Sequence, residues 1–158
     1  MQTIYDLNLK MLEDVLANYG QKPYRAKQIF TWLYKKRCAS FDEMTDLPAS
    51  LIEKFKAEYC INPLKELTRQ VAKDGTTKYL FEMQDGSSVE AVLMHFHFGD
   101  SLCVSSQIGC NMGCSFCASG LLKKQRDLTA GEMTAEVMYV QKELDKIEGR
   151  VDNIVIMG

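Results

Sequence analysis

Three cysteines lie within one short stretch of the chain, Cys110, Cys114 and Cys117, in a CxxxCxxC pattern. Thiolates at this density suit zinc or an iron–sulfur cluster. A structural zinc site normally closes with a fourth Cys or His, but residues 118–124 contain neither, and both histidines lie upstream. In a cubane of four irons, three thiolates leave one iron without a protein ligand. The spacing therefore predicts a metal centre with an open binding position.

Two further groups upstream of this motif are able to do chemistry. Cys103 lies in a Leu-Cys-Val-Ser-Ser run that predicts a buried strand, where a lone cysteine is a small core residue. On the preceding strand, Glu90 shares one face with Val92, Met94 and Phe96 by the two-residue period. Apolar neighbours would raise the pKa of the Glu90 carboxyl, as a general base requires. The simpler alternative is a solvated glutamate at a wet strand end.

The metal motif, with the aromatic Phe116 just before its last cysteine, resembles the cluster motif of the radical S-adenosylmethionine (SAM) enzymes. The flanking residues narrow the resemblance. They read CVSSQIG at 103–109, ASG at 118–120 and IVIMG at 154–158, and they are similar to the RlmN/Cfr family of RNA adenine methyltransferases. The resemblance extends through nearly all 158 residues.

The resemblance implies that Cys110, Cys114 and Cys117 hold a 4Fe-4S cluster whose open iron chelates SAM, with Phe116 packed beside both. In such enzymes an electron from the cluster generates a deoxyadenosyl radical, which activates a methyl group carried on a cysteine near the C-terminus. The resulting carbon radical adds to adenine. By the same resemblance, Cys103 matches the second cysteine, which resolves the covalent adduct.

Glu90 matches the proton acceptor of the family. Radical chemistry suits carbon C2 of adenine, which is electron-poor between two ring nitrogens and is no nucleophile for ordinary methyl transfer. RlmN-like enzymes act at C2 and Cfr-like relatives mainly at C8, and this part of the chain does not separate them. We favour C2, because the housekeeping enzyme is the commoner bearer of the pattern.

The resemblance also implies partners: RNA, namely 23S rRNA and also tRNA, and an electron donor such as flavodoxin. The full-length protein is expected to be a monomer. A competing hypothesis is a non-catalytic binding module, in which a helical RNA-contacting unit carries a zinc or iron–sulfur knob. The residues do not distinguish ribosomal from transfer RNA as the natural substrate.

Composition sets the protein class. The 158 residues are 46% hydrophobic and 25% charged, a balance typical of a soluble globular chain. The start has neither a basic stretch nor an apolar run, and no later stretch approaches a membrane span. We therefore expect a cytoplasmic protein without membrane contact and with reduced thiols. Cys38 and Cys60 match no motif and are expected to be structural.

A net charge of −2 argues against a protein-wide electrostatic attraction to nucleic acid. Any RNA contact must be local. Residues 21–37 contain no acidic side chain and several aromatic ones, and their candidate RNA-binding cations are Lys22, Arg25, Lys35, Lys36 and Arg37. A helix with a solvated basic face is the alternative explanation, because charge runs are weak evidence of binding.

The elements that position these groups begin with a helical unit over residues 1–60. Apolar spacing predicts a helix over 8–19 that ends at Gly20, a second opened by Pro23 and a third opened by Pro48. Ser40 and Glu43 form a capping-box pair before a short turn. Turn signals at 74–75 and 85–86 then predict an antiparallel meander, with strands near 66–72, 77–83 and 88–97.

The last part predicts one parallel strand–loop–helix–strand unit. A buried strand at 102–106 precedes the cysteines, a helix with a Thr129/Glu132 capping box runs to about Ile147, and a second buried strand covers 153–157. Its expected apolar stripe comprises Met133, Val137, Val140 and Leu144. The cysteine loop then lies at the C-terminal end of a parallel strand, where α/β barrels place their active sites.

The predicted fold is therefore an α+β N-terminal accessory domain followed by the first β-loop-α-β unit of a partial α/β, TIM-like radical SAM barrel. The accessory domain covers residues 1–98, with a helical part at 1–60 and the meander at 61–98. The barrel part covers 99–158, with the border near Gly99 and Asp100. In the family the chain continues beyond this point. We therefore expect an N-terminal part that lacks the methyl-carrying cysteine and does not turn over alone.

Overall fold

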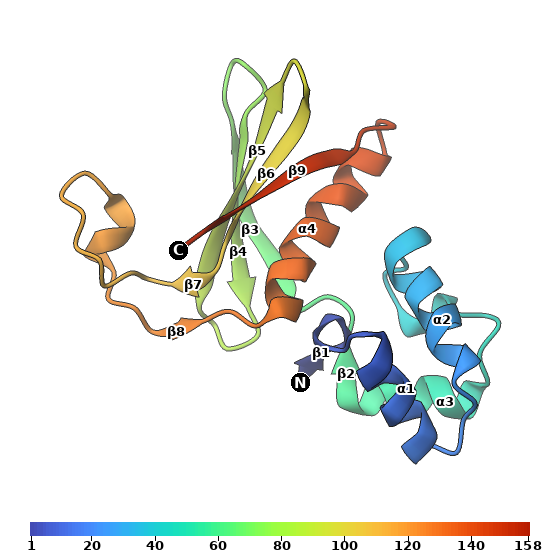
Figure 1. Ribbon diagram of the computed structural model, residues 1–158. Helices are drawn as coiled ribbons and strands as arrows, with labels where there is room; N and C mark the ends of the chain where they lie inside the picture. Colours follow the sequence, from blue (N-terminus) through green and yellow to red (C-terminus); the bar gives the residue numbers. More distant parts are fainter. The chain divides into compact units, whose positions relative to one another are not determined.

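The computed structural model describes residues 1–158, apart from the surroundings of Gly120. The chain is mixed α/β and divides into two compact units, Met1–Pro63 and Leu64–Gly158. Figure 1 shows short helices in the first unit, and the long strands together with the longest helix in the second. In the part of the chain that the structure describes, no helix has the length and apolar character needed to cross a membrane.

The first unit is helical, as expected. Two short parallel strands, β1 and β2, pair Gln2 with Tyr59 and so join the two ends of the unit. Its elements are β1 (Gln2–Thr3), η1 (Ile4–Asp6), α1 (Leu9–Asn18), α2 (Tyr24–Phe30), η2 (Thr31–Lys35), η3 (Phe41–Glu43), α3 (Ala49–Glu58) and β2 (Tyr59–Cys60).

Aromatic rings fill the centre of this unit. Phe55 on α3 is almost fully buried. Its ring centroid lies 5.8 Å from those of Tyr19 and Tyr59 and 5.9 Å from that of Phe41. Rings at these separations add favourable edge and stacking contacts to the area they bury. Phe55 thus connects α3 to the end of α1 and to η3.

Local signals in this unit are confirmed. Gly20 has a φ of +70° just beyond α1, where Gln21 N–H donates to the Leu16 carbonyl at 2.8 Å. Ser40 and Glu43 form the predicted capping box, here at the start of the 3-10 turn η3. Pro48 precedes α3 as its N-cap, one position earlier than expected.

The second helix continues as a π-helix, which the sequence pattern did not predict. Over η2 the Lys36 N–H donates to the carbonyl of Thr31 at 2.9 Å, a five-residue span. The segment ends at Lys35, and Arg37 just beyond it has a φ of 52°. Compared with a continuous α-helix, the π-helical turn therefore changes the directions in which the last cations of the basic segment point.

The second unit is built on one five-stranded sheet in the order β3-β4-β5-β6-β9. The first four strands are antiparallel neighbours, and β9 is parallel to β6. Its elements are β3 (Leu64–Val71), β4 (Thr77–Met83), β5 (Ser88–Phe96), β6 (Gly99–Ser105), β7 (Gln107–Ile108), η4 (Ala118–Leu121), β8 (Arg126–Asp127), α4 (Ala130–Asp145) and β9 (Val151–Met157).

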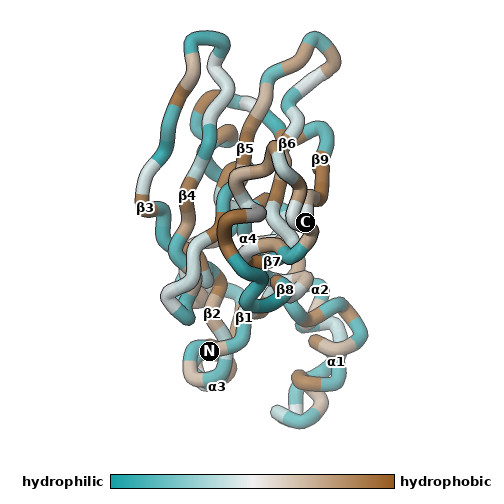
Figure 2. Tube along the Cα trace, turned by 90° about the vertical axis from the view of Figure 1, so that its left-hand side faces the viewer, coloured by the Kyte–Doolittle hydropathy of each residue, from teal (hydrophilic) through white to brown (hydrophobic). Residues whose placement is uncertain are grey.

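The strand bounds agree with the predicted meander and with the predicted parallel unit. The predicted burial of the last strand is wrong, because Ile154, Val155, Ile156 and Met157 on β9 are all exposed. Buried and more exposed positions alternate along β4 and β5. Figure 2 shows apolar and polar residues intermixed along the trace of these strands. One face of these strands is buried, with Tyr79, Phe81, Val89, Ala91 and Leu93 pointing inward. Because the side-chain period of a strand is two, Glu90 lies on the opposite face.

Helix α4 covers the buried face of the sheet. The Tyr139 ring lies 4.9 Å from that of Phe81, and its hydroxyl donates to Glu66 Oε2 at 2.9 Å. The Thr129/Glu132 capping box is confirmed. The predicted apolar stripe is partly wrong, because Met133 and Val137 are only half-buried. The most buried positions of α4 are instead Gly131, Ala135, Glu136, Met138, Val140 and Leu144.

The division into compact units lies at residues 63/64, whereas the predicted domain border lies at 98/99. The predicted border falls between β5 and β6, which pair Val92 with Cys103 in the same sheet. The meander therefore packs with the parallel strands, and the helical part forms a unit of its own.

We expect Phe55→Ala to destabilise the first unit by about 3–5 kcal/mol, because it removes a ring that several others contact. Urea unfolding followed by the emission of Trp32, the only tryptophan, reports on this unit. Met11→Ala, at an exposed position, is the control and should stay within about 0.5 kcal/mol of the wild type. An unchanged midpoint for Phe55→Ala would contradict this core assignment.

Candidate metal centre and neighbouring groups

The three motif cysteines lie on one loop, residues 109–125, which we call the cysteine loop. It is closed by a short antiparallel ladder, the neck, in which β7 pairs with β8. Two backbone bonds continue the ladder: Gln125 N–H donates to the Ile108 carbonyl at 2.8 Å, and Cys110 N–H to the Leu122 carbonyl at 2.9 Å. The loop follows β6 and projects away from the sheet (Figure 1).

Gly109 is required where the loop leaves the neck. Its φ is +69°, and an added Cβ would overlap the carbonyl of Lys123 on the returning strand. Both facts exclude a larger residue without movement of the backbone. The two sides of the loop therefore lie close together just before Cys110.

The cysteine side chains are accessible. Cys114 and Cys117 are exposed and Cys110 is half-buried. Phe116 is 91% exposed and so lies clear of the protein core. Among the described residues, no group of three His, Cys, Asp or Glu side chains is arranged to hold a metal ion. The donor set itself, three thiols on one open loop, fits an iron–sulfur cluster chemically.

Glu90 and Cys103 lie on neighbouring strands and on the same face of the sheet. Cys103 pairs directly with Val92, two residues beyond Glu90 on β5. The Ser105 hydroxyl donates to the Glu90 carbonyl at 2.7 Å, which fixes this part of β5 against the end of β6. The structure thus brings the two predicted catalytic residues to the strand end that leads into the cysteine loop.

The expectation that apolar side chains surround the Glu90 carboxyl is wrong. Its side chain is 53% exposed, and one of its oxygens lies 3.0 Å from the Lys78 ammonium. The alternating pattern identified the face correctly, but that face is the one α4 leaves uncovered. For Cys103, half-burial raises the pKa of the thiol, and the nearby Glu136 adds to this shift. Cys103 is therefore a neutral thiol at physiological pH.

Glu136 was not singled out from the sequence, and it is the one fully buried acidic side chain of the described residues. Its Oε2 accepts the Ser105 N–H at 3.2 Å, whereas Oε1 has no hydrogen-bond partner. Burial raises its pKa to about 8, against the lowering effect of the Ser105 bond. Its spacing of four and eight residues from Val140 and Leu144 was a signal, since all three share one helix face.

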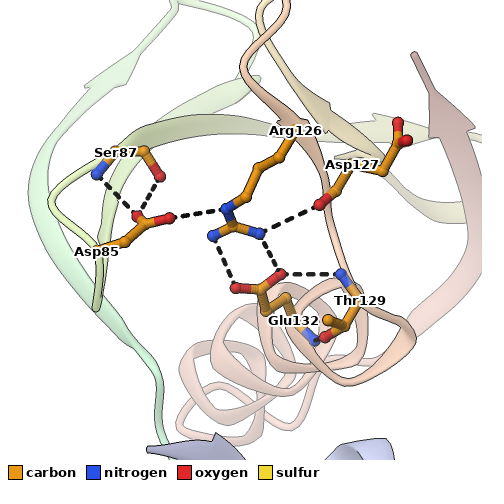
Figure 3. A network of polar contacts seen from close by, with 6 residues as sticks. All are labelled: Asp85, Ser87, Arg126, Asp127, Thr129 and Glu132. Carbon is orange, nitrogen blue, oxygen red and sulfur yellow. Dashed lines mark hydrogen bonds and ion pairs between the residues drawn. The ribbon is translucent and has the colours of Figure 1, made fainter.

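Arg126 is the second group missed by sequence reasoning. Its guanidinium binds both oxygens of Glu132 at 2.8 and 2.9 Å, and its Nε donates to Asp85 Oδ2 at 2.7 Å. Figure 3 shows this fork between the β4–β5 turn and the start of α4. Hydrogen bonds from Ser87, and then the Arg126 charge, hold the pKa of Asp85 well below its usual range.

The predicted RNA-binding cations lie on α2, η2 and the residues flanking them. Lys22, Lys35 and Lys36 are exposed, and Arg25 and Arg37 are half-buried. The Lys36 ammonium lies 3.3 Å from the centre of the Trp32 ring, whose Nε1 donates to Asp46 at 2.6 Å. This cation–π contact orders one cation but leaves it at the surface.

Comparisons with known proteins show which class of protein the chain resembles. The chain is similar to the crystal structure of a radical SAM methyltransferase from Sphaerobacter thermophilus, with a TM-score of 0.91 and 39% identity. That alignment covers 98% of this chain and 46% of the solved one. The fold described here is therefore that of part of a radical SAM methyltransferase.

Sequence comparison narrows the class. Residues 2–61 match the family model "Ribosomal RNA large subunit methyltransferase N-terminal domain". The chain is 54% identical to the probable dual-specificity RNA methyltransferase RlmN of Streptococcus suis, covering 99% of this chain and 43% of the relative. The corresponding protein of Oceanobacillus iheyensis is 49% identical, with 44% of its length covered. The chain belongs to the RlmN family, and it spans less than half the length of these relatives.

We expect Glu136→Gln to remove a pH dependence of stability. The folded carboxyl has a pKa near 8 and its ordinary value is 4.5, so the unfolded chain loses this proton first as the pH rises. The stability that the wild type has below pH 4.5 is therefore lost progressively up to pH 8. Gln stays neutral, so thermal unfolding at pH 8.5 should show a variant about 2–4 kcal/mol more stable than the wild type.

Glu143→Gln on the same helix is the matched control. Hydrogen bonding from Lys146 lowers the pKa of Glu143, so its contribution is present above the ordinary value and is lost on acidification. The control should thus change stability with the opposite sign of pH dependence. A Glu136→Gln variant with the wild-type slope between pH 5 and 8 would show that Glu136 is ionised in the folded protein.

Proposed function

We propose that this chain is the N-terminal part of a radical SAM enzyme that methylates carbon C2 of adenine in 23S rRNA and tRNA through a methyl-cysteine intermediate. The observation that carries this proposal is the loop with three thiols that follows β6, the strand bearing Cys103, after the short strand β7. The relatives' names, dual-specificity RNA methyltransferase, support the reaction class and an RNA substrate.

The proposal includes the wider architecture. Strand β6, helix α4 and strand β9 have the parallel arrangement of a first barrel unit, and the cysteine loop follows the C-terminal end of β6. We propose that residues 99–158 begin a radical SAM domain and that 1–98 act as an accessory domain. The complete enzyme would be a cytoplasmic monomer that takes electrons from a donor such as flavodoxin.

The chain's own residues have separate tasks in this reaction. Cys110, Cys114 and Cys117 would hold a 4Fe-4S cluster, and the exposed Phe116 would pack beside it and the bound SAM. Such a cluster supplies one-electron reduction and an iron that lacks a protein ligand. Because the loop is open, the remainder of the enzyme or its substrate must exclude water from this site.

Glu90 and Cys103 would act on the RNA substrate. The carboxylate of Glu90, which lies 3.0 Å from the Lys78 ammonium, would accept the proton that the substituted ring carbon loses. Cys103 would resolve the covalent enzyme–RNA adduct. Because burial raises the pKa of its thiol, Cys103 must lose a proton before it attacks, and a half-buried position protects it from competing reactions until then.

We expect the 158-residue chain to take up about four irons after anaerobic reconstitution. Replacing Cys110, Cys114 or Cys117 by Ala removes a ligand, so iron and sulfide content should fall several-fold in each variant. Cys103→Ala is the matched control, because it removes a thiol outside the loop and should keep full iron loading. Full loading of the triple variant would refute the cluster assignment.

The basic segment of the first unit is proposed to contact RNA. Neutralising Lys35, Lys36 and Arg37 to Gln should weaken binding of single-stranded RNA and reduce the slope of log affinity against log salt by about 2. Neutralising Lys10, Lys54 and Lys56, on α1 and α3, is the control of equal charge. Equal effects of both sets would mean that only net charge matters and that these cations form a solvated face.

A further inference from the structure

We infer that Arg126 is a positioning residue, which holds the neck of the cysteine loop so that the three thiols are presented together to a metal cluster. This inference rests on the proposed function for the identity of what the loop binds. The contacts by which Arg126 holds the neck are present whatever the loop binds. Nothing in the motif spacing of the loop assigns this role.

The neck is too short to be stable alone. Strands β7 and β8 contribute two residues each, and an isolated two-stranded ladder is marginal in water even when longer. The loop it closes is exposed almost throughout, so it buries little apolar surface of its own. The buried side chains of Ile108 and Leu128 anchor the ladder, and Leu128 N–H donates to the Ser106 carbonyl at 2.9 Å.

Arg126 adds the contact that fixes the direction of the neck. One edge of its planar guanidinium meets both oxygens of Glu132, and its Nε meets Asp85 from another side (Figure 3). Its side chain is 33% exposed, so solvent weakens each ion pair. The value of the fork is geometric, because a bidentate pair and a third bond in fixed directions define an orientation.

Both anchors are themselves held in place. Glu132 Oε2 also accepts the Thr129 N–H at 2.8 Å within the capping box of α4. Asp85 Oδ1 accepts the Ser87 N–H at 3.0 Å within the β4–β5 turn. Arg126 therefore joins three elements, β8, the turn and α4, through partners that have little freedom. A motion of the neck would have to break bonds on both sides.

A cavity of about 460 Å³ lies between the turn and the neck. It is lined on one side by Asp85, Gly86, Ser87 and Ser88, and on the other by Ile108, Gly109, Leu122 and Gln125. Side chains do not fill this space, so fewer van der Waals contacts join the two walls there. The bond from Arg126 to Asp85 runs from the neck to the turn beside this space.

The chain offers a matched control in Arg69. This arginine binds both oxygens of Glu66, reaches Glu143 on α4 at 3.3 Å, and is 37% exposed. It therefore joins β3 to α4 with the same chemistry that Arg126 uses, but away from the cysteine loop. Loss of either fork should lower global stability by a similar amount.

The experiment compares the wild type with Arg126→Gln, Arg126→Lys and Arg69→Gln in the 158-residue chain. Hydrogen exchange of the neck amides of Cys110, Gln125 and Leu128 is measured first, without metal. We expect about tenfold faster exchange in both Arg126 variants, since lysine keeps the charge but not the fork. Iron content after reconstitution should fall at least twofold in these variants and stay at the wild-type level in Arg69→Gln.

The possible outcomes distinguish the positioning role of Arg126 from the proposed function of the loop. Unchanged neck exchange, unchanged iron loading, or full rescue by lysine would overturn the positioning role. Faster exchange throughout the sheet in Arg126→Gln would also overturn it, since the residue would then serve global folding. Faster neck exchange in a protein whose wild type binds no iron would support the hold on the neck and refute the proposed function instead.

Discussion

The pairing of β6 on both of its edges is the interaction on which the second unit depends. β6 is antiparallel to β5 on one side and parallel to β9 on the other, so a single strand joins the meander to the parallel unit. This pairing places Cys103 beside β5, where Glu90 lies, and directs the chain into the cysteine loop. Burial of the opposite face beneath α4 leaves the face with both residues open.

Charge arrangement complements this geometry. Helix α4 is linked to neighbouring segments by two arginines: Arg126 binds Glu132 in its first turn, and Arg69 reaches Glu143 in its last turns. Between them, the buried Glu136 makes one bond to the backbone of β6. A helix that covers the sheet is thus bound near both ends, and in its middle it carries a buried acid that is bonded to the end of β6.

Local signals in the sequence predicted most of the fold. Both capping boxes and both hairpin turns depend on residues a few positions apart, and all are present. The exceptions depend on tertiary contacts. The buried face of α4 is turned toward Glu136 because of how the helix lies on the sheet, which no periodicity within the helix specifies. Likewise, the period of β5 assigned Glu90 to a face correctly but could not tell which face a helix would cover.

Only part of the candidate site could be predicted from the sequence. The loop with its thiols was evident because ligand spacing is local, and the family resemblance supplied Cys103 and Glu90. Arg126 was not, because its partners lie in a turn and in a helix start, and only the folded chain brings Asp85 and Glu132 to one guanidinium. The roles of these residues in catalysis stay predictions until they are measured.

The π-helical segment η2 has an evolutionary consequence. A turn that spans five residues where an ordinary helix spans four accommodates one additional amino acid without breaking the helix. Deleting one residue there would restore α-helical hydrogen bonding and rotate Lys35, Lys36 and Arg37 by about 100° relative to the buried Ala26 and Ile29. Length variation at this point would therefore let homologues re-aim a basic surface while keeping the same core.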